Sequence, residues 1–166
     1  SSIMSSLSST YGGIASLAGI NIPNQGTGNR TLLAKELMES RSFVKHILNV
    51  SPDIKKNLIA AVDYNHNKKE LIYDEKIFDV KKNIWLIDEP TYLDLYDVYM
   101  SKVFGVFVDI ETGYLTVSVE HQSPIYAKDL LNIIIDELNA LVRKQDLLKS
   151  TKSLNYLEEK TRVSSF

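Results

Sequence analysis

The last 43 residues of the chain constrain its fold most, because they contain no residue that readily ends a helix. They follow Ser123, a residue type preferred at a helix N-cap, and begin with Pro124, which suits the first helical position. No glycine or proline occurs after Pro124. At about 1.5 Å per residue such a helix would be roughly 65 Å long, whereas a domain of ~120 residues is about 35 Å across. The sequence therefore predicts a C-terminal helix that projects beyond its own domain.

The composition of this predicted helix changes along its length. Residues 125–142 are mostly apolar, whereas residues 143–166 carry only scattered apolar side chains among charged ones. We expect the first part to belong to a hydrophobic core and the second to form an exposed arm. Isolated helices are marginally stable, so a long one usually packs its apolar side against something. The candidate oligomer-contact stripe of the arm consists of four leucines, Leu147, Leu148, Leu154 and Leu157.

A β-hairpin is predicted immediately before this helix. The runs VFGVFVDI and YLTVSVEH are rich in β-branched and aromatic residues, and the segment ETG separates them. In the second run Leu115, Val117 and Val119 alternate with polar residues, so they would share one face. The sequence thus predicts two antiparallel strands within 103–121, with a turn at 111–113 and one buried face.

The segments before the hairpin predict helices joined by loops and one short strand. Apolar spacing favours one helix over about 31–49 and another over 91–102. Ser51-Pro52 predicts the start of a further short helix, with the serine as N-cap and the proline in the first turn. Residues 63–76 are polar and rich in turn-forming residues, and the run NIWLID at 83–88 is typical of a short strand.

Tyrosines recur along the predicted helix 91–102. Tyr92, Tyr96 and Tyr99 are three or four residues apart, which places them on one side of a helix. We expect them mainly to pack against the hairpin, and a binding surface is the alternative.

Together these elements predict an α+β fold, in which helices pack a small sheet with a β-hairpin and a long C-terminal helix projects from the domain. Residues 1–123 would form the α/β domain, and residues 124–166 the start of the extended helix. The opening stretch is rich in serine and glycine, so residues 1–10 are expected to be mobile. A short helix is expected to follow and to pack on the domain through Ile14, Leu17 and Ile20.

Composition excludes several classes of protein. The formal net charge is −2 and no run of lysine and arginine with interleaved aromatic residues occurs, so no nucleic-acid partner is expected. The absence of cysteine rules out disulfides, thiolate metal sites and a cysteine nucleophile. No segment reaches the roughly 18 to 20 apolar residues that span a bilayer, and the N-terminal stretch lacks the features of a signal peptide.

A search for chemistry yields no catalytic, cofactor-binding or metal-binding residue. The run NQGTGNRT lacks the spacing of a phosphate-binding loop. The histidines His46, His66 and His121 are scattered, and none has a second ligand at metal-binding spacing. We therefore expect no enzyme and no cofactor. Two other classes stay open, a cytosolic adaptor with a coiled-coil helix and, less favoured, a nucleotide-binding enzyme domain that uses the GTGN segment.

The order of the motifs is similar to that of a known family. The run ESRSF supplies Ser40, Arg41 and Phe43, and the hairpin and its Ser-Pro-capped helix supply a second set of matches, namely Gly113, Leu115, Val117, Val119, Pro124, Ala127 and Asn132. Over most of residues 5–160 the chain resembles the extracytoplasmic domain of the Wzz-type chain-length determinants, the polysaccharide co-polymerases of bacterial surface-polysaccharide assembly.

The resemblance implies a non-enzymatic regulator of the chain length of O-antigen or a related glycan. Such a protein acts as an oligomeric periplasmic scaffold, with a polysaccharide polymerase and the nascent glycan as partners. It is held in the inner membrane by segments that this chain does not contain, so the opening stretch would be interior sequence and residues 1–123 a membrane-proximal domain. This chain would then be a monomer or weak oligomer in solution, and the full-length protein a closed ring. The polysaccharide, the subunit number and the presence of a cytoplasmic kinase domain stay open.

Overall fold

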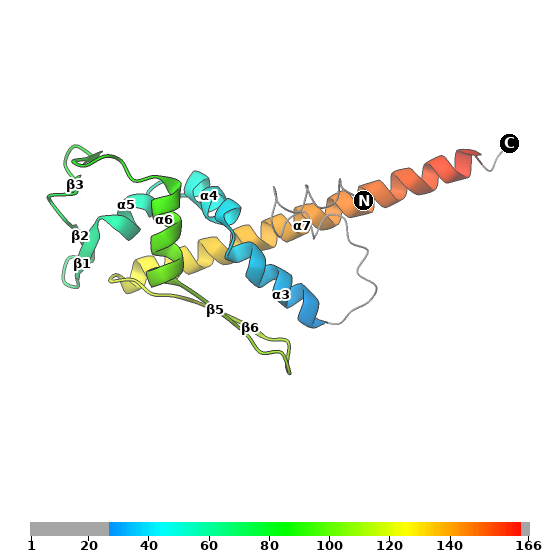
Figure 1. Ribbon diagram of the computed structural model, residues 1–166, viewed down its shortest axis with the longest axis horizontal. Coiled ribbons are helices and arrows are strands. Elements are labelled where there is room, and N and C mark those ends of the chain that lie inside the picture. Colours follow the sequence, from blue (N-terminus) through cyan, green and yellow to red (C-terminus); the bar gives the residue numbers. More distant parts are fainter. Residues whose placement is uncertain (1–26, 164–166) are drawn as a thin grey trace.

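The fold is α+β, as the sequence predicts. The computed structural model describes residues 27–163, in which three two-stranded antiparallel sheets pack with helices and a long C-terminal helix extends from the body (Figure 1). The expectations for residues 1–10 and for the short helix with Ile14, Leu17 and Ile20 lie outside the described residues, as do positions 164–166.

Two helices replace the single helix predicted over 31–49. Helix α3 spans Thr27–Met38 and α4 spans Arg41–Val50. The prediction is wrong at Ser40, which has extended backbone and acts as the N-cap of α4. Its Oγ accepts a hydrogen bond from the Phe43 N–H (3.2 Å) and donates one to the Leu37 carbonyl (2.7 Å). One serine side chain therefore satisfies the end of one helix and the start of the next.

Helix α5 spans Ile54–Ile59 and follows the segment SPD, with Asp53 at its N-cap position. The prediction that Ser51 caps it is wrong, because this serine instead closes α4 by donating its N–H to the Ile47 carbonyl (2.8 Å). The Ser51 carbonyl then accepts from the Ile54 N–H (3.1 Å) across a turn through Pro52. The proline therefore turns the chain between the two helices.

The polar stretch predicted as turns contains a hairpin. Strand β1 (Ala61–Asn65) pairs antiparallel with β2 (Glu70–Tyr73). The turn is built by an asparagine side chain, since Asn65 Oδ1 accepts from the backbone N–H groups of Asn67 and Lys68. Strands β3 (Phe78–Asp79) and β4 (Ile84–Trp85) form a second small pair, which confirms the core of the strand predicted at 83–88.

The segment after these strands follows the prediction more closely. Helix α6 (Tyr92–Val98) continues into a π-helical turn, η1 (Tyr99–Val103), which ends one residue after the range predicted as helix. The predicted β-hairpin is confirmed, with β5 (Phe104–Val108) paired to β6 (Leu115–Val119) and Gly113 at a φ of 73° in the turn. Its apolar residues on β6 are half-buried against the core, and the polar ones between them are exposed.

Helix α7 spans Pro124–Val163 and crosses the body before extending away from it (Figure 1). Its first half contributes to the hydrophobic core, which is formed by side chains of α3, α4, α5, α6, η1, the hairpin and α7. The fully buried members of this core are Leu37, Met38, Phe43, Val44, Ile47, Ile54, Leu95, Tyr99, Leu130 and Ile134. The outer half of α7 lies beyond this cluster.

Candidate assembly surface

The base of α7 is fixed by its N-cap. Ser123 is buried, and its Oγ accepts a hydrogen bond from the Tyr126 N–H (3.1 Å). The His121 ring supports this cap, because its Nδ1 accepts from the Ser123 N–H (3.1 Å) and its Nε2 lies 2.9 Å from the Asn57 carbonyl. The start of the helix is therefore held by the His121 side chain, which is itself anchored at the backbone of α5.

The inner half of α7 packs into the body, as the sequence predicts. Leu130 and Ile134 have no exposed surface, and Leu138 is also buried. On the flank of this contact the His46 Nε2 on α4 lies 2.6 Å from the Glu137 carboxylate, which connects the two helices. The direction of the projecting part is consequently determined by the body.

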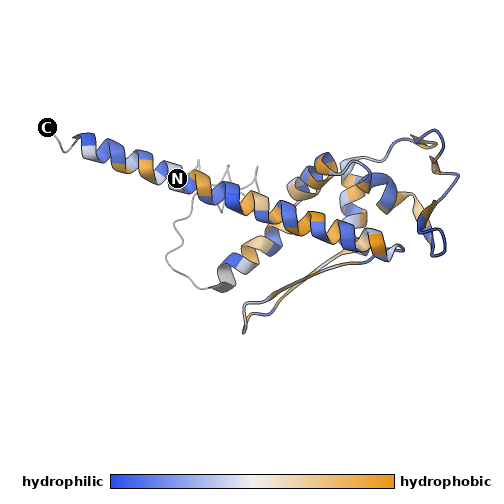
Figure 2. Cartoon of the chain, turned by 180° about the vertical axis from the view of Figure 1, so that it is seen from behind, coloured by the Kyte–Doolittle hydropathy of each residue, from blue (hydrophilic) through white to orange (hydrophobic). Residues whose placement is uncertain are grey.

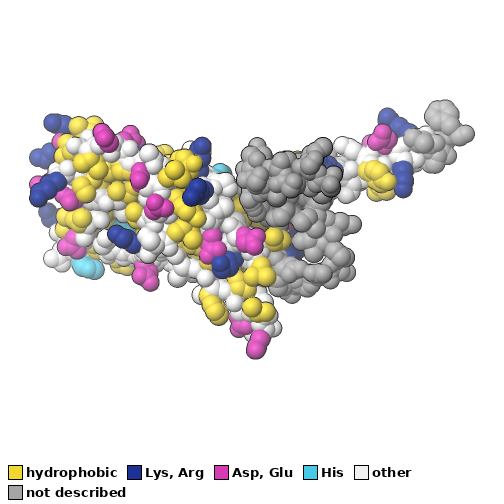
Figure 3. All heavy atoms as spheres, viewed as in Figure 1, with side chains coloured by type: hydrophobic (Ala, Val, Ile, Leu, Met, Phe, Trp, Pro, Cys, Tyr) yellow, Lys and Arg dark blue, Asp and Glu magenta, His cyan; other side chains and the backbone are white. Residues whose placement is uncertain are grey.

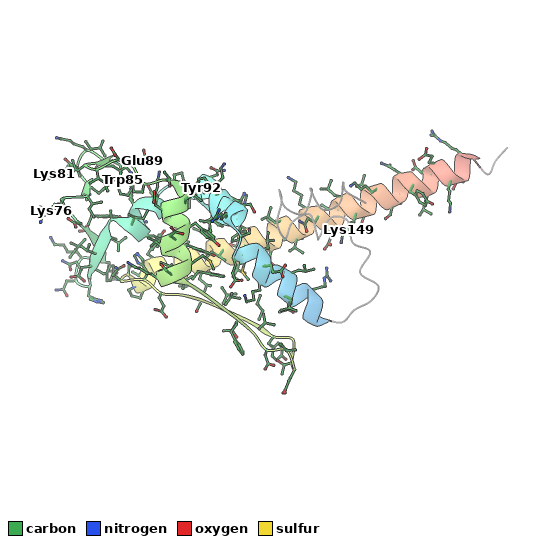
Figure 4. All side chains as sticks on the ribbon, viewed as in Figure 1. Lys76, Lys81, Trp85, Glu89, Tyr92 and Lys149 are labelled. Atoms are coloured by element: carbon green, nitrogen blue, oxygen red, sulfur yellow. The ribbon has the colours of Figure 1, made fainter. Side chains whose placement is uncertain are left out.

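The outer half of α7 is the predicted arm, and every residue from Asp146 to Arg162 is exposed. The candidate stripe lies here, with exposed fractions of 69% for Leu147, 55% for Leu148, 61% for Leu154 and 58% for Leu157. Figure 2 shows hydrophobic residues becoming sparse toward the outer end of this helix. In Figure 4 the labelled Lys149 likewise lies on the arm, outside the body.

The four leucines lie along two lines of the helix. At about 100° of rotation per residue, Leu147, Leu154 and Leu157 fall within a quarter-turn of one another. Leu148 is rotated by about 100° from Leu147 and follows Leu141, a half-buried core residue, by two helical turns. Leu148 therefore extends the core-facing line of α7, and the other three leucines form a separate line.

The three histidines each have a partner within the fold, and most of the GTGN segment belongs to a helix. His46 pairs with Glu137, His121 bonds backbone groups, and His66 packs edge-on against the Tyr64 ring. No group of histidine and carboxylate side chains within 27–163 is arranged to hold a metal ion. Residues 27–29 of the GTGN segment form the first turn of α3.

The tyrosines of the helix 91–102 differ in burial, and only Tyr99 stacks on the hairpin as predicted. Tyr99 is fully buried and stacks on Phe104 of the hairpin, with ring centroids 4.8 Å apart, and its burial raises its pKa. Tyr92 and Tyr96 are half-buried and lie under two cations of α4. The Lys45 Nζ is 5.1 Å from the Tyr92 ring centroid, and the Arg41 guanidinium carbon is 5.7 Å from that of Tyr96. We call these four residues the tyrosine ridge.

A second surface, which the sequence reading missed, is the end of the β5–β6 hairpin. Ile110 and Tyr114 are 84% and 74% exposed, and Phe107 is 65% exposed. We call these three residues, with Asp109 and Glu111, the hairpin tip. Apolar residues inside the turn sequence DIETGY were the available signal, since turn residues are usually polar. In Figure 3 hydrophobic and acidic side chains gather at the end of the projecting hairpin.

Hydrogen bonds of the turn hold the tip in shape. The Asp109 carboxylate accepts from the N–H groups of Thr112 and Glu111, and these bonds, that of Thr112 first, keep its pKa below the ordinary value. The Thr31 Oγ1 on α3 donates to the Gly113 carbonyl (3.1 Å), which holds the turn next to the first part of that helix. The tip is therefore a shaped, negatively charged projection.

No protein-family model, no curated protein and no solved structure matches the chain. Among the described helices, none combines the length and apolarity needed to cross a membrane.

Proposed function

We propose that the chain is part of the extracytoplasmic domain of a chain-length determinant of the polysaccharide co-polymerase type. In this role it is a non-enzymatic, periplasmic scaffold of a bacterial inner-membrane protein. Several copies assemble, and the assembly influences how far a polymerase extends a surface glycan such as O-antigen. The resemblance of the ESRSF segment and of the capped helix after the hairpin supports this proposal.

The observation that carries the proposal is the construction of α7. One end of this helix is capped and buried in the core, and the other presents exposed leucines beyond the body. Exposed helices of this length normally gain stability by packing on another surface. Neighbouring copies and a returning helix would supply that surface in the assembly. The chain by itself is then a monomer or weak oligomer, and the full-length protein forms a closed ring.

The same arm also fits an adaptor whose terminal helix forms half of a coiled coil. The sequence that flanks this region in its gene separates the two functions. Apolar spans of about 20 residues on either side favour the membrane-anchored scaffold, and their absence favours the adaptor.

The decisive experiment deletes the gene and resolves the surface glycan by gel electrophoresis. We expect the distribution of chain lengths to lose its preferred length and to regain it when the gene is restored. A variant with Leu147, Leu154 and Leu157 changed to serine should fold but fail to restore the distribution. A glycan profile that does not depend on the gene would exclude this function, and light scattering of the full-length protein in detergent tests the ring separately.

A further inference from the structure

We propose that the hairpin tip of one copy docks on the tyrosine ridge of a second copy. This inference rests on the proposed scaffold and identifies the surfaces through which its domains join. The tip presents the exposed side chains of Phe107, Ile110 and Tyr114 together with exposed Glu111, and the ridge presents two cations above Tyr92 and Tyr96.

The charges of the two surfaces are complementary. The hairpin tip carries the carboxylates of Asp109 and Glu111, and no lysine or arginine occurs anywhere in residues 103–127. On the ridge, Arg41 and Lys45 each lie above a tyrosine ring. Neither cation has a carboxylate within ion-pair distance in the part of the chain that the structure describes. Asp94 and Asp97 are exposed on α6 as well, so the complementary charges are those of Arg41 and Lys45 themselves and not a net charge of the two helices.

The apolar parts of the two surfaces also fit one another. Aromatic and aliphatic side chains surrounded by complementary charge are typical of protein–protein contacts, in which tyrosine and arginine often supply much of the binding energy. The cations on the ridge are already positioned on the tyrosine rings, so less side-chain freedom is lost when a carboxylate binds them. Leu93, the residue that follows Tyr92 on α6, is 41% exposed. In Figure 4 Tyr92 lies at the end of α6, on the surface of the body.

The tip belongs on another copy, because it cannot reach the ridge of its own chain. The Thr31–Gly113 hydrogen bond holds the turn against the first part of α3. The ridge begins at Arg41, on the next helix, beyond the break of the chain at Ser40 between α3 and α4. In Figure 3 the acidic end of the hairpin and the positively charged surface near α4 are likewise well separated.

A contact between two different surfaces has a geometric consequence. Each copy offers one tip and one ridge, so both stay available for further copies when a first pair forms. Such head-to-tail contacts produce a ring when the rotation closes. The inferred docking is therefore of the kind that a ring-shaped scaffold requires.

Cysteine cross-linking tests the contact directly, since the chain contains no cysteine. Ile110→Cys is placed on the tip and Leu93→Cys beside the ridge, and both variants are expressed in cells that make the glycan. Cells with both single variants should give a cross-linked dimer, whereas cells with either variant alone should give none. One chain with both cysteines should give a ladder of larger products. Ile110→Cys paired with Val62→Cys, which is exposed on β1, is the matched control and should remain uncross-linked.

Charge exchange provides the second measurement. Glu111→Lys and Lys45→Glu should each reduce cross-linking about tenfold by placing like charges together, and the double variant should restore it. Asp109 is left unchanged because it holds the turn.

Three outcomes would overturn the docking: cross-linking of Ile110→Cys with itself, cross-linking to Leu147→Cys on the arm, or no cross-linking at all. The glycan profile from the same cells is read separately. If Ile110→Cys and Leu93→Cys do not cross-link but the glycan profile still depends on the gene, the docking alone is rejected. If they cross-link but deleting the gene leaves the glycan profile unchanged, the proposed function alone is rejected.

Discussion

Replacing a leucine by alanine at two positions of α7 should change the free energy of unfolding by very different amounts. Leu130 has no exposed surface, whereas Leu154, on the same helix, is 61% exposed. Leu130→Ala removes buried methyl groups and leaves a cavity, which costs about 2–5 kcal/mol in comparable cores. Leu154→Ala removes little buried surface, and alanine favours helix slightly more than leucine does, so its effect should lie within about 0.5 kcal/mol. Such a loss at Leu130 is a large share of the roughly 5–15 kcal/mol of a typical domain.

Urea unfolding followed by tryptophan fluorescence measures this difference. The chain has a single tryptophan, Trp85, whose ring packs edge-on against the buried Phe78 at a centroid distance of 5.1 Å, so it reports on the body and not on the arm. With a slope of about 2 kcal/mol per molar urea, Leu130→Ala should lower the midpoint by about 1–2.5 M. Equal midpoints for the two variants would show that the inner half of α7 is not part of the core. A large shift for Leu154→Ala in the monomer would show that the arm packs within its own chain.

Three further variants test the local structure. Val117→Asp should destabilise the domain by about 1–3 kcal/mol because it places an unpaired charge on the half-buried, core-facing side of β6, whereas Thr116→Asp on the exposed face should change the urea midpoint little; similar losses would refute the register. Ser123→Ala should cost about 1 kcal/mol through loss of the α7 cap, measurable by the same unfolding, and Ser123→Asn should recover most of it. Hydrogen bonds from the Thr91 hydroxyl and N–H lower the pKa of Asp94 in the folded protein. Its ionised carboxylate therefore stabilises the fold fully above the ordinary pKa near 3.8, and this stabilisation is lost as the pH falls through the lower pKa of the folded state. Wild type should therefore exceed Asp94→Asn in stability at pH 6 and lose that advantage in acid, and a pH-independent difference would contradict this assignment.

Segments with regular apolar spacing were predictable from sequence. The β5–β6 hairpin has alternating apolar residues and a glycine in its turn, and the helix after it begins with a serine cap and a proline. Each of these local patterns favours one secondary structure over the others. The break at Ser40 was not predictable, because helical spacing continues across it and the serine serves both helices. The β1–β2 hairpin was missed for the opposite reason, since its strands are short and polar and its turn depends on the Asn65 side chain.

The assembly surfaces were only partly predictable. The leucines of the arm stand out because a helix without glycine or proline must continue past the core. The tyrosine ridge forms because cations of α4 lie over tyrosine rings of α6. The spacing of Tyr92 and Tyr96 within α6 does not predict this contact between two helices. The exposure of Ile110 similarly follows from the way the hairpin extends beyond α3, which alternation along the strands does not specify.

The two lines of leucines on α7 bear on how an arm could serve a ring. Leu148 continues the line that begins in the core with Leu130 and Leu141, whereas Leu147 and Leu154 open a second line about a quarter-turn away. A partner on the first line would prolong the packing that already holds the helix, and a partner on the second would approach from another side. Each subunit of a head-to-tail ring contacts two neighbours through two different surfaces. In the proposed scaffold, the arm therefore offers two different apolar surfaces to its neighbours, just as the body offers the tip and the ridge. An arm with a single apolar line would instead favour a symmetric pair of two copies.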